Sequence, residues 1–144
     1  MQDRDPVELA AGILRRADRS VREIDERLAR AGVDDERRAE TLKTLSRLGY
    51  VDDARVALRR AAALSGRGYG DAAIRADLVR RGISGDNIAA ALDALESERE
   101  RAAALVARDG ASPAIARRLA AKGFAAETIE AAIEVVAAGA DESV

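Results

Sequence analysis

The 144-residue chain contains no cysteine and no histidine. It therefore forms no disulfide, and it lacks thiol nucleophiles, imidazole acid–base groups and the usual zinc ligands. Aromatic residues make up only 2% of the chain, which is too few for a platform on which nucleic-acid bases stack. No run of about 20 apolar residues is long enough to cross a membrane. We predict a protein that is not an enzyme, uses no cofactor or metal, and has no membrane partner.

The charges nearly cancel, since the formal net charge is −2 although 35% of the residues are charged. Such a balance argues against tight, non-specific binding of nucleic acid by charge alone. Nearly all basic residues are arginines. This preference reflects either a GC-rich genome or a need for guanidinium groups that bind carboxylates or phosphates. The segment from Met1 to Pro6 has no apolar core of a signal peptide. We expect a cytoplasmic protein.

An Ile-Leu-Gly pattern with four-residue spacing occurs three times, as Ile24-Leu28-Gly32, Ile74-Leu78-Gly82 and Ile115-Leu119-Gly123. Apolar residues four positions apart lie on one face of a helix. A glycine after them is typical of a helix end, because glycine readily adopts a left-handed backbone. Each copy therefore predicts a helix, a tight turn and another helix. Their spacing of roughly 40 to 50 residues is typical of repeated helical modules.

Cap signals and apolar stripes extend the pattern to an all-α fold of nine helices in three groups of three. Ser20 and Glu23 form a capping box, and Ser112-Pro113 is a helix start signal. Between residues 86 and 108 there is no glycine or proline, so we expect the last helix of the second group to run nearly straight into the third. The predicted units are three helical repeats and a disordered tail: residues 1–49, 50–96, 97–138 and 139–144.

Two motifs have both a chemical and a structural interpretation. Gly66-x-Gly68-x-Gly70 is spaced like a phosphate-binding loop, but it follows a predicted helix and lacks a Gly-Lys-Ser/Thr sequence, so a helix–helix loop is favoured. Asp52-Asp53 is a pair of carboxylates, but no third ligand or partner base is near in sequence. One of these two aspartates is expected to cap the following helix, and either Gly70 or Asp71 the helix after the loop.

Adjacent arginines recur along the chain at Arg15-Arg16, Arg37-Arg38, Arg59-Arg60, Arg80-Arg81 and Arg117-Arg118. They either complement the negative ends of helices or form a partner surface, because similar charges recur on equivalent helices. Tyr69, between two glycines, is expected to be the most exposed aromatic side chain. The candidate partner-binding residues, expected to be exposed, are Arg59, Arg67, Tyr69, Arg75, Arg80, Arg81, Arg117, Arg118 and Lys122.

The motifs together resemble those of the RecX family, bacterial regulators of the RecA recombinase, over about residues 8 to 136. The clearest match is Leu48-Gly49-Tyr50-Val51-Asp52-Asp53-x-Arg55-x-Ala57, then Gly68, then Ile74-x-x-Asp77-Leu78-x-x-Arg81-Gly82-Ile83. The segment Ser20-x-x-Glu23-Ile24-x-x-x-Leu28 resembles the first module of the family, and Arg118-Leu119-x-x-Lys122-Gly123-Phe124-x-x-x-x-Ile129 resembles the third.

The resemblance implies three tandem three-helix repeats that form an elongated, curved right-handed array. It implies a protein that binds the RecA–single-stranded DNA filament and limits its growth, ATP hydrolysis and strand exchange. The three repeats by themselves lead us to expect a monomer. Single-stranded DNA is expected to bind weakly or only through the filament. The alternative is a small helical DNA-binding module that acts without RecA, since paired helices can enter a major groove.

Overall fold

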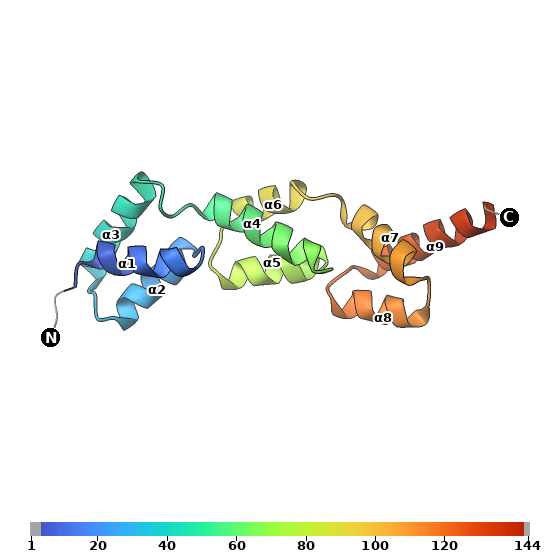
Figure 1. Cartoon of the computed structure of the whole chain (residues 1–144), viewed down its shortest axis with the longest axis horizontal. Coiled ribbons are helices and arrows are strands. Elements are labelled where there is room, and N and C mark those ends of the chain that lie inside the picture. Colours follow the sequence, from blue (N-terminus) through green and yellow to red (C-terminus); the bar gives the residue numbers. More distant parts are fainter. Residues whose placement is uncertain (1–3, 143–144) are drawn as a thin grey trace.

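The computed structural model describes residues 4–142 as helices joined by short connections (Figure 1). The helices are α1 (Pro6–Arg16), α2 (Val21–Arg30), α3 (Asp35–Arg47), α4 (Asp53–Gly66), α5 (Asp71–Arg80), α6 (Gly85–Asp93), α7 (Glu98–Asp109), α8 (Pro113–Ala121) and α9 (Ala126–Glu142). Within this described part of the chain no strand occurs, and none of the helices has the length and apolar character to cross a membrane. The predicted all-α fold is confirmed.

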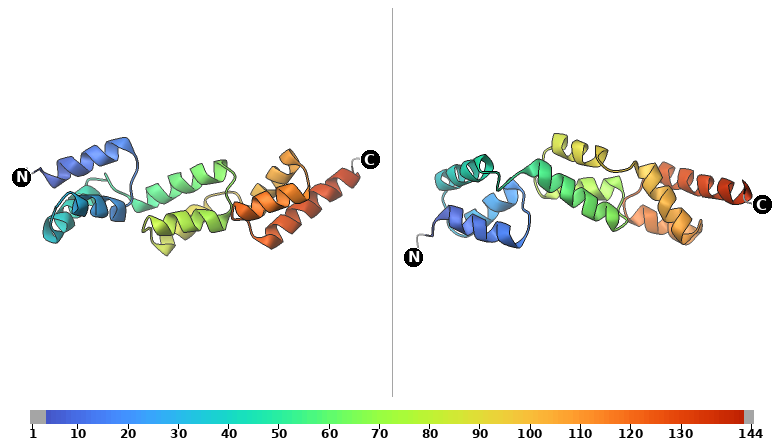
Figure 2. Two further views of the ribbon diagram at one scale, coloured as in Figure 1. Left: turned by 90° about the horizontal axis from the view of Figure 1, so that it is seen from below. Right: turned by 45° about the horizontal axis from the view of Figure 1, so that its top comes forward.

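Successive triplets of helices pack around separate apolar cores, and we call them the first (α1–α3), second (α4–α6) and third (α7–α9) repeats. The three repeats follow one another in an elongated row (Figures 1 and 2). The Ile and Leu of every copy of the sequence pattern are buried in these cores: Ile24, Leu28, Ile74, Leu78, Ile115 and Leu119. The borders proposed from the sequence fall in the connections before α4 and α7.

Most helices begin with the polar caps that the sequence indicates. The hydroxyl of Ser20 accepts the backbone N–H of Glu23, whose carboxylate accepts the N–H of Ser20 in return. Asp52 caps α4, whereas Asp53 accepts the N–H of Val21 at 2.9 Å and so joins α4 to α2. The cap of α5 is Gly70, not Asp71.

The second helix of each repeat meets the next one end to end, along the lower side of Figure 1. At the start of α5, the N–H groups of Gly70 and Ala72 donate to the carbonyl oxygens of Lys122 and Gly123 in the turn after α8, at 2.8 and 3.3 Å. These bonds satisfy backbone groups that helix ends otherwise leave without partners. The third repeat is therefore bonded backbone to backbone to the second.

The junction between α2 and α5 has the same arrangement but uses side chains. The Ser20 hydroxyl donates to the carbonyl oxygen of Arg81, and the Arg22 guanidinium donates to that of Arg80. The two junctions therefore place the three second helices in one line, with the start of α2 against the end of α5 and the start of α5 against the end of α8.

The expected continuous helix between the second and third repeats is wrong. α6 ends at Asp93 and α7 begins at Glu98, after Ser97. The Ser97 hydroxyl accepts the N–H of Glu100 at 3.1 Å. This cap replaces the intrahelical bond that a continuous helix would require, so the chain changes direction without glycine or proline.

The last helix is longer than the sequence indicated. α9 continues to Glu142, although a disordered tail was expected from residue 139. Several alanines near this end favour the helix because alanine has the highest helix propensity. Residues 143–144 of the expected tail lie outside the described residues.

Candidate partner-binding surface

The nine candidate residues separate into three groups in the structure. One group lies at the junction of the second and third repeats. Another consists of arginines on α5 and α8, the two helices that meet end to end. The remaining arginines face the first repeat. The structure therefore brings some of the candidates together and uses others to hold the repeats in place.

Tyr69 is the centre of the group at the junction. The Lys122 ammonium lies 4.3 Å from the centroid of its ring, and the Arg67 guanidinium lies 5.7 Å from it, both within the range of cation–π attraction. Lys122 also donates to the carbonyl oxygen of Arg67 at 3.0 Å. Two cations from different repeats therefore share one aromatic ring.

The sequence suggested that Tyr69 is the most exposed aromatic residue, and this prediction is wrong. Its N–H donates to the carbonyl oxygen of Leu64, and its half-buried side chain packs against the core of the second repeat. Tyr50 is 59% exposed instead. Flanking glycines indicated the turn correctly, but they do not determine whether the ring packs against the core.

Arg101 supports this junction from α7, although it is not among the residues predicted from the sequence. Its side chain is only 9% exposed and donates to Asp71 at 2.9 Å and to the carbonyl oxygen of Tyr69 at 3.2 Å. The guanidinium also lies 5.8 Å from the centre of the Phe124 ring. Nothing in the sequence distinguishes Arg101 from other arginines, because its partners are about 30 residues away in the chain.

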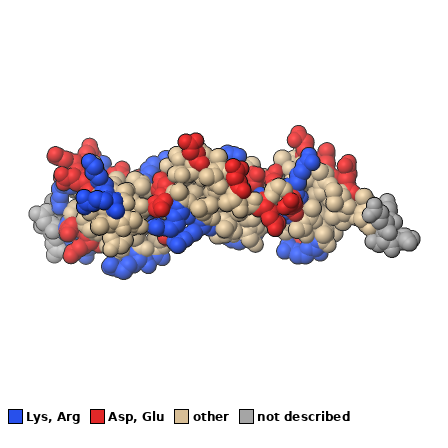
Figure 3. Space-filling view, turned by 90° about the horizontal axis from the view of Figure 1, so that it is seen from above, with Lys and Arg blue, Asp and Glu red and all other residues tan. Residues whose placement is uncertain are grey.

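The arginines on α5 and α8 are largely exposed. Within residues 4–142, Arg75 and Arg117 form no ion pair. Arg80 is 71% exposed and lies 3.8 Å from Asp77, while Arg118 donates to Asp109. Figure 3 views the opposite side of the row, where small positive patches on each repeat are interrupted by acidic side chains. Unpaired guanidinium groups can bind carboxylates or phosphates through two parallel hydrogen bonds.

Arg81 differs from its neighbour because its side chain joins two repeats. It lies 3.0 Å from Asp77 and 3.3 Å from Glu23 of α2, and it is only 23% exposed. Arg60 holds the same Asp77 from α4. The expectation that Arg80 and Arg81 are both exposed is therefore wrong for Arg81.

Arg59 also contacts the first repeat. Its guanidinium bonds Asp18 at 2.9 Å, although it is 63% exposed. A solvent-exposed pair of this kind typically contributes less than about 1 kcal/mol, so the side chain can exchange Asp18 for another partner.

The acidic groups at the first junction have shifted pKa values. Burial raises the pKa of Glu23, but hydrogen bonds from Ser20 and the charge of Arg81 lower it more, so the pKa lies below its ordinary value of 4.5. Burial likewise raises the pKa of Asp77, and the hydrogen bonds from Arg60 and Arg81 bring it below its ordinary 3.8. Both carboxylates are therefore held in the charged form.

We expect this network to weaken in acid. A carboxylate with a lowered pKa in the folded state stabilises the fold above its ordinary pKa, and that contribution is lost as the pH falls through the folded value. The pH range over which this stabilisation is lost begins near the ordinary pKa values of 4.5 and 3.8 and extends below them. Thermal unfolding between pH 6 and pH 3 should show a smaller loss of Tm in a Glu23→Gln, Asp77→Asn variant than in the wild type. Equal losses would show that the network contributes nothing to this dependence.

The described residues contain no group of three acidic side chains placed to hold a metal ion. The candidate residues of the surface offer positive charge and hydrogen-bond donors from arginine and lysine. Comparison with known proteins points to the same family as the sequence motifs. Residues 52–92, which span α4, α5 and most of α6, match the family model for the second three-helix domain of RecX. The resemblance to the RecX family is confirmed.

Similar curated proteins carry the name Regulatory protein RecX. The one from Stenotrophomonas maltophilia (strain R551-3) is 33% identical over 97 residues, and the one from Xanthomonas campestris pv. campestris (strain B100) is 30% identical. Each match covers 67% of this chain and 60% of the relative. The chain thus spans about 60% of the length of these family members.

Solved structures of the family have the same fold. The crystal structure of RecX from Lactobacillus salivarius superposes with a TM-score of 0.79 at 19% identity, covering 91% of this chain and 94% of that one. A second crystal structure, of regulatory protein RecX, has a TM-score of 0.72 at 22% identity and covers 87% of this chain and 69% of the other. At such low identity the likeness demonstrates the fold and does not transfer individual contacts.

Proposed function

We propose that this protein is a cytoplasmic monomer that binds the RecA–single-stranded DNA filament and mainly inhibits its ATP hydrolysis, growth and strand exchange. The observation that carries the proposal is the line of α5 and α8, which presents exposed arginines across a junction bonded backbone to backbone. The similarity to proteins named Regulatory protein RecX supports the choice of partner.

An extended row suits a filament better than it suits a small ligand. A repeat array offers one long surface, so several weak contacts act together when their spacing matches that of the partner. Arg75 and Arg80 on α5 and Arg117 and Arg118 on α8 provide such contacts on two repeats. The filament carries phosphates, and a recombinase surface carries carboxylates; guanidinium groups bind both.

The rigid junction is what makes these contacts cooperative. Arg67, Tyr69 and Lys122 join the end of α4 to the end of α8, so the charges of α5 and α8 keep one relative position. A partner that matches this position does not have to order the repeats on binding, which lowers the entropy cost of association.

The direct test measures ATP hydrolysis by RecA filaments on single-stranded DNA as the protein is added. We expect hydrolysis to fall as the protein binds, and strand exchange to fall with it. The same titration monitored by light scattering should show shorter filaments. Unchanged hydrolysis and unchanged filaments at saturating protein would contradict the proposal. Tight binding to free duplex DNA together with no effect on the filament would favour the alternative of a DNA-binding module that acts without RecA.

A further inference from the structure

A groove in the first repeat forms a second, separate basic site. It lies between α1 and α2 and holds about 720 Å³ of open space. Five arginines line it, against two acidic residues, and these arginines are Arg4, Arg15, Arg16, Arg19 and Arg27. None of the nine candidate partner-binding residues belongs to this group. The groove includes the Arg15-Arg16 pair, which takes no part in the proposed contacts on α5 and α8.

Most of these arginines are free to bind a ligand. Within the described residues, Arg4, Arg16 and Arg27 form no ion pair. Arg19 forms an ion pair with Glu23, with 3.4 Å between the guanidinium nitrogen and the carboxylate oxygen. At the junction of the first and second repeats, by contrast, Arg60 and Arg81 are paired with carboxylates. The near-zero net charge of the whole chain therefore conceals a local excess of positive charge.

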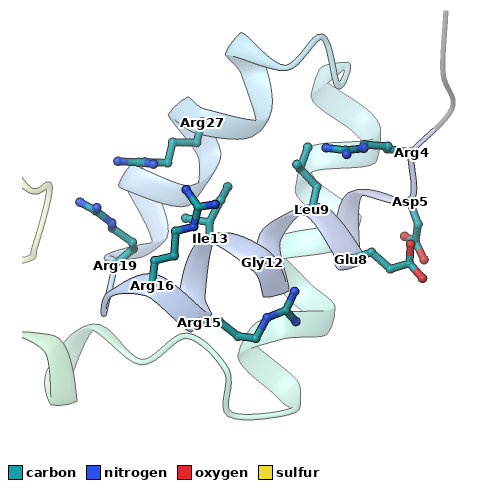
Figure 4. Close-up of a pocket in the computed structure, with 10 residues that line it drawn as sticks. All are labelled: Arg4, Asp5, Glu8, Leu9, Gly12, Ile13, Arg15, Arg16, Arg19 and Arg27. Atoms are coloured by element: carbon teal, nitrogen blue, oxygen red, sulfur yellow. The ribbon is translucent and has the colours of Figure 1, made fainter.

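Most of the lining arginines extend into the groove, whereas Arg15 points to the other side of α1 (Figure 4). In Figure 4, Arg16, Arg19 and Arg27 extend toward the same side, next to Ile13. Arg4 lies at the other end, near Leu9. A ligand that meets all of these cations must carry negative charges spaced along its length.

The acidic residues of the groove do not compete for the same position. In Figure 4, Asp5 and Glu8 point away from Arg16, Arg19 and Arg27. Asp5 also caps α1, because its carboxylate accepts the N–H of Val7 at 3.0 Å. Within the described residues, Arg16 and Arg27 therefore have no carboxylate partner, whereas Arg19 pairs with Glu23 of α2.

We propose that the groove binds the phosphodiester backbone of a single-stranded nucleic acid, independently of the filament contacts on α5 and α8. The floor contains Leu9, Gly12 and Ile13 and no aromatic ring, so it offers nothing on which bases stack. Binding is therefore through phosphates and does not depend on base sequence. Arginine binds phosphate oxygens through paired hydrogen bonds.

An acidic peptide fits this groove less well than a phosphodiester chain. The walls are the helices α1 and α2, whose interior backbone groups already bond one another. The amide groups of a peptide laid between them would lose water without gaining backbone partners, which costs free energy. A phosphodiester chain has no amide groups to satisfy and requires only cations at intervals.

The test uses the full chain without recombinase and measures fluorescence anisotropy of a labelled oligothymidylate. The groove variant is Arg16→Ala with Arg27→Ala. The control variant is Lys43→Ala with Arg47→Ala, which removes the same charge from α3, outside the groove. We expect the groove variant to bind at least about tenfold more weakly. The slope of log K against log salt should fall by about 1.4, since each phosphate contact on a single strand contributes about 0.7.

Three results would overturn the proposal. They are no binding by the wild type at low salt, equal losses in the groove and control variants, and displacement of the oligothymidylate by polyglutamate as readily as by unlabelled DNA. Circular dichroism of both variants should show that the helices are intact. Filament inhibition is measured on the same variants and is expected to persist, so failure of the groove and failure of the α5–α8 surface are seen separately.

Discussion

Replacing Gly123 with alanine is expected to lower the free energy of unfolding by about 2–5 kcal/mol. Gly123 has a φ of +94°, which costs a residue with a side chain roughly 1–2 kcal/mol. In addition, a Cβ at this position would lie 2.7 Å from the Cβ and the backbone nitrogen of Ala73. Forcing atoms into such a packed site typically costs a further 1–3 kcal/mol. Urea unfolding followed by circular dichroism measures the sum.

Gly32→Ala is the matched control, because the same turn ends α2 but nothing packs on it. Gly32 has a φ of +88°, and a Cβ there would meet no atom within 4 Å. We expect it to lose only the backbone term of about 1–2 kcal/mol. Equal losses at Gly32 and Gly123 would mean that the close approach of the second and third repeats does not contribute to stability.

Glutamate in place of Arg75 and Arg117 is expected to raise the concentration needed for half-maximal inhibition of the RecA ATPase at least about tenfold. Reversing the two charges removes attraction and places repulsive carboxylates against a negatively charged partner. A tenfold change corresponds to about 1.4 kcal/mol of binding free energy. Both residues are exposed, so substitution should change stability by only about 0.5 kcal/mol.

The control for this charge reversal is Lys43→Glu with Arg47→Glu, which changes the net charge equally on α3 of the first repeat. We expect it to inhibit like the wild type. Arg81 is left unchanged, because a glutamate there would face Glu23 and Asp77 and weaken the first junction. If the folded Arg75, Arg117 variant inhibits at wild-type concentrations, the filament contacts lie elsewhere on the chain.

Local features of the fold were predictable from the sequence. The Ile-Leu-Gly spacing identified the buried helix faces and the turns, because side-chain periodicity and the left-handed preference of glycine act over a few residues. The capping box of Ser20 and Glu23 was predictable for the same reason. The break at Ser97 was not predictable in the same way, because no glycine or proline marks it and serine also occurs within continuous helices.

The site was less predictable than the fold. Arg80 and Arg81 are adjacent and chemically identical, yet Arg80 is exposed and Arg81 bonds Glu23, which is 58 positions away in the chain. The same holds for Arg101, which donates hydrogen bonds to Asp71 and Tyr69 of the preceding repeat. Sequence spacing determines on which side of its own helix an arginine lies, but it does not show which other helix packs there.

By itself, the sequence determined that the protein is helical, that it is built of three similar units, and where each unit buries its apolar face. It also revealed the resemblance to the RecX family, because the order and spacing of motifs are properties of the chain. Only the tertiary structure decided which arginines are free and which ones join repeats. It also decided that Arg27 of α2 meets the arginines of α1 and its flanking segments at the groove of the first repeat. The physical reason is that a charge is neutralised or left available by partners distant in sequence, and folding alone brings them within a few ångströms.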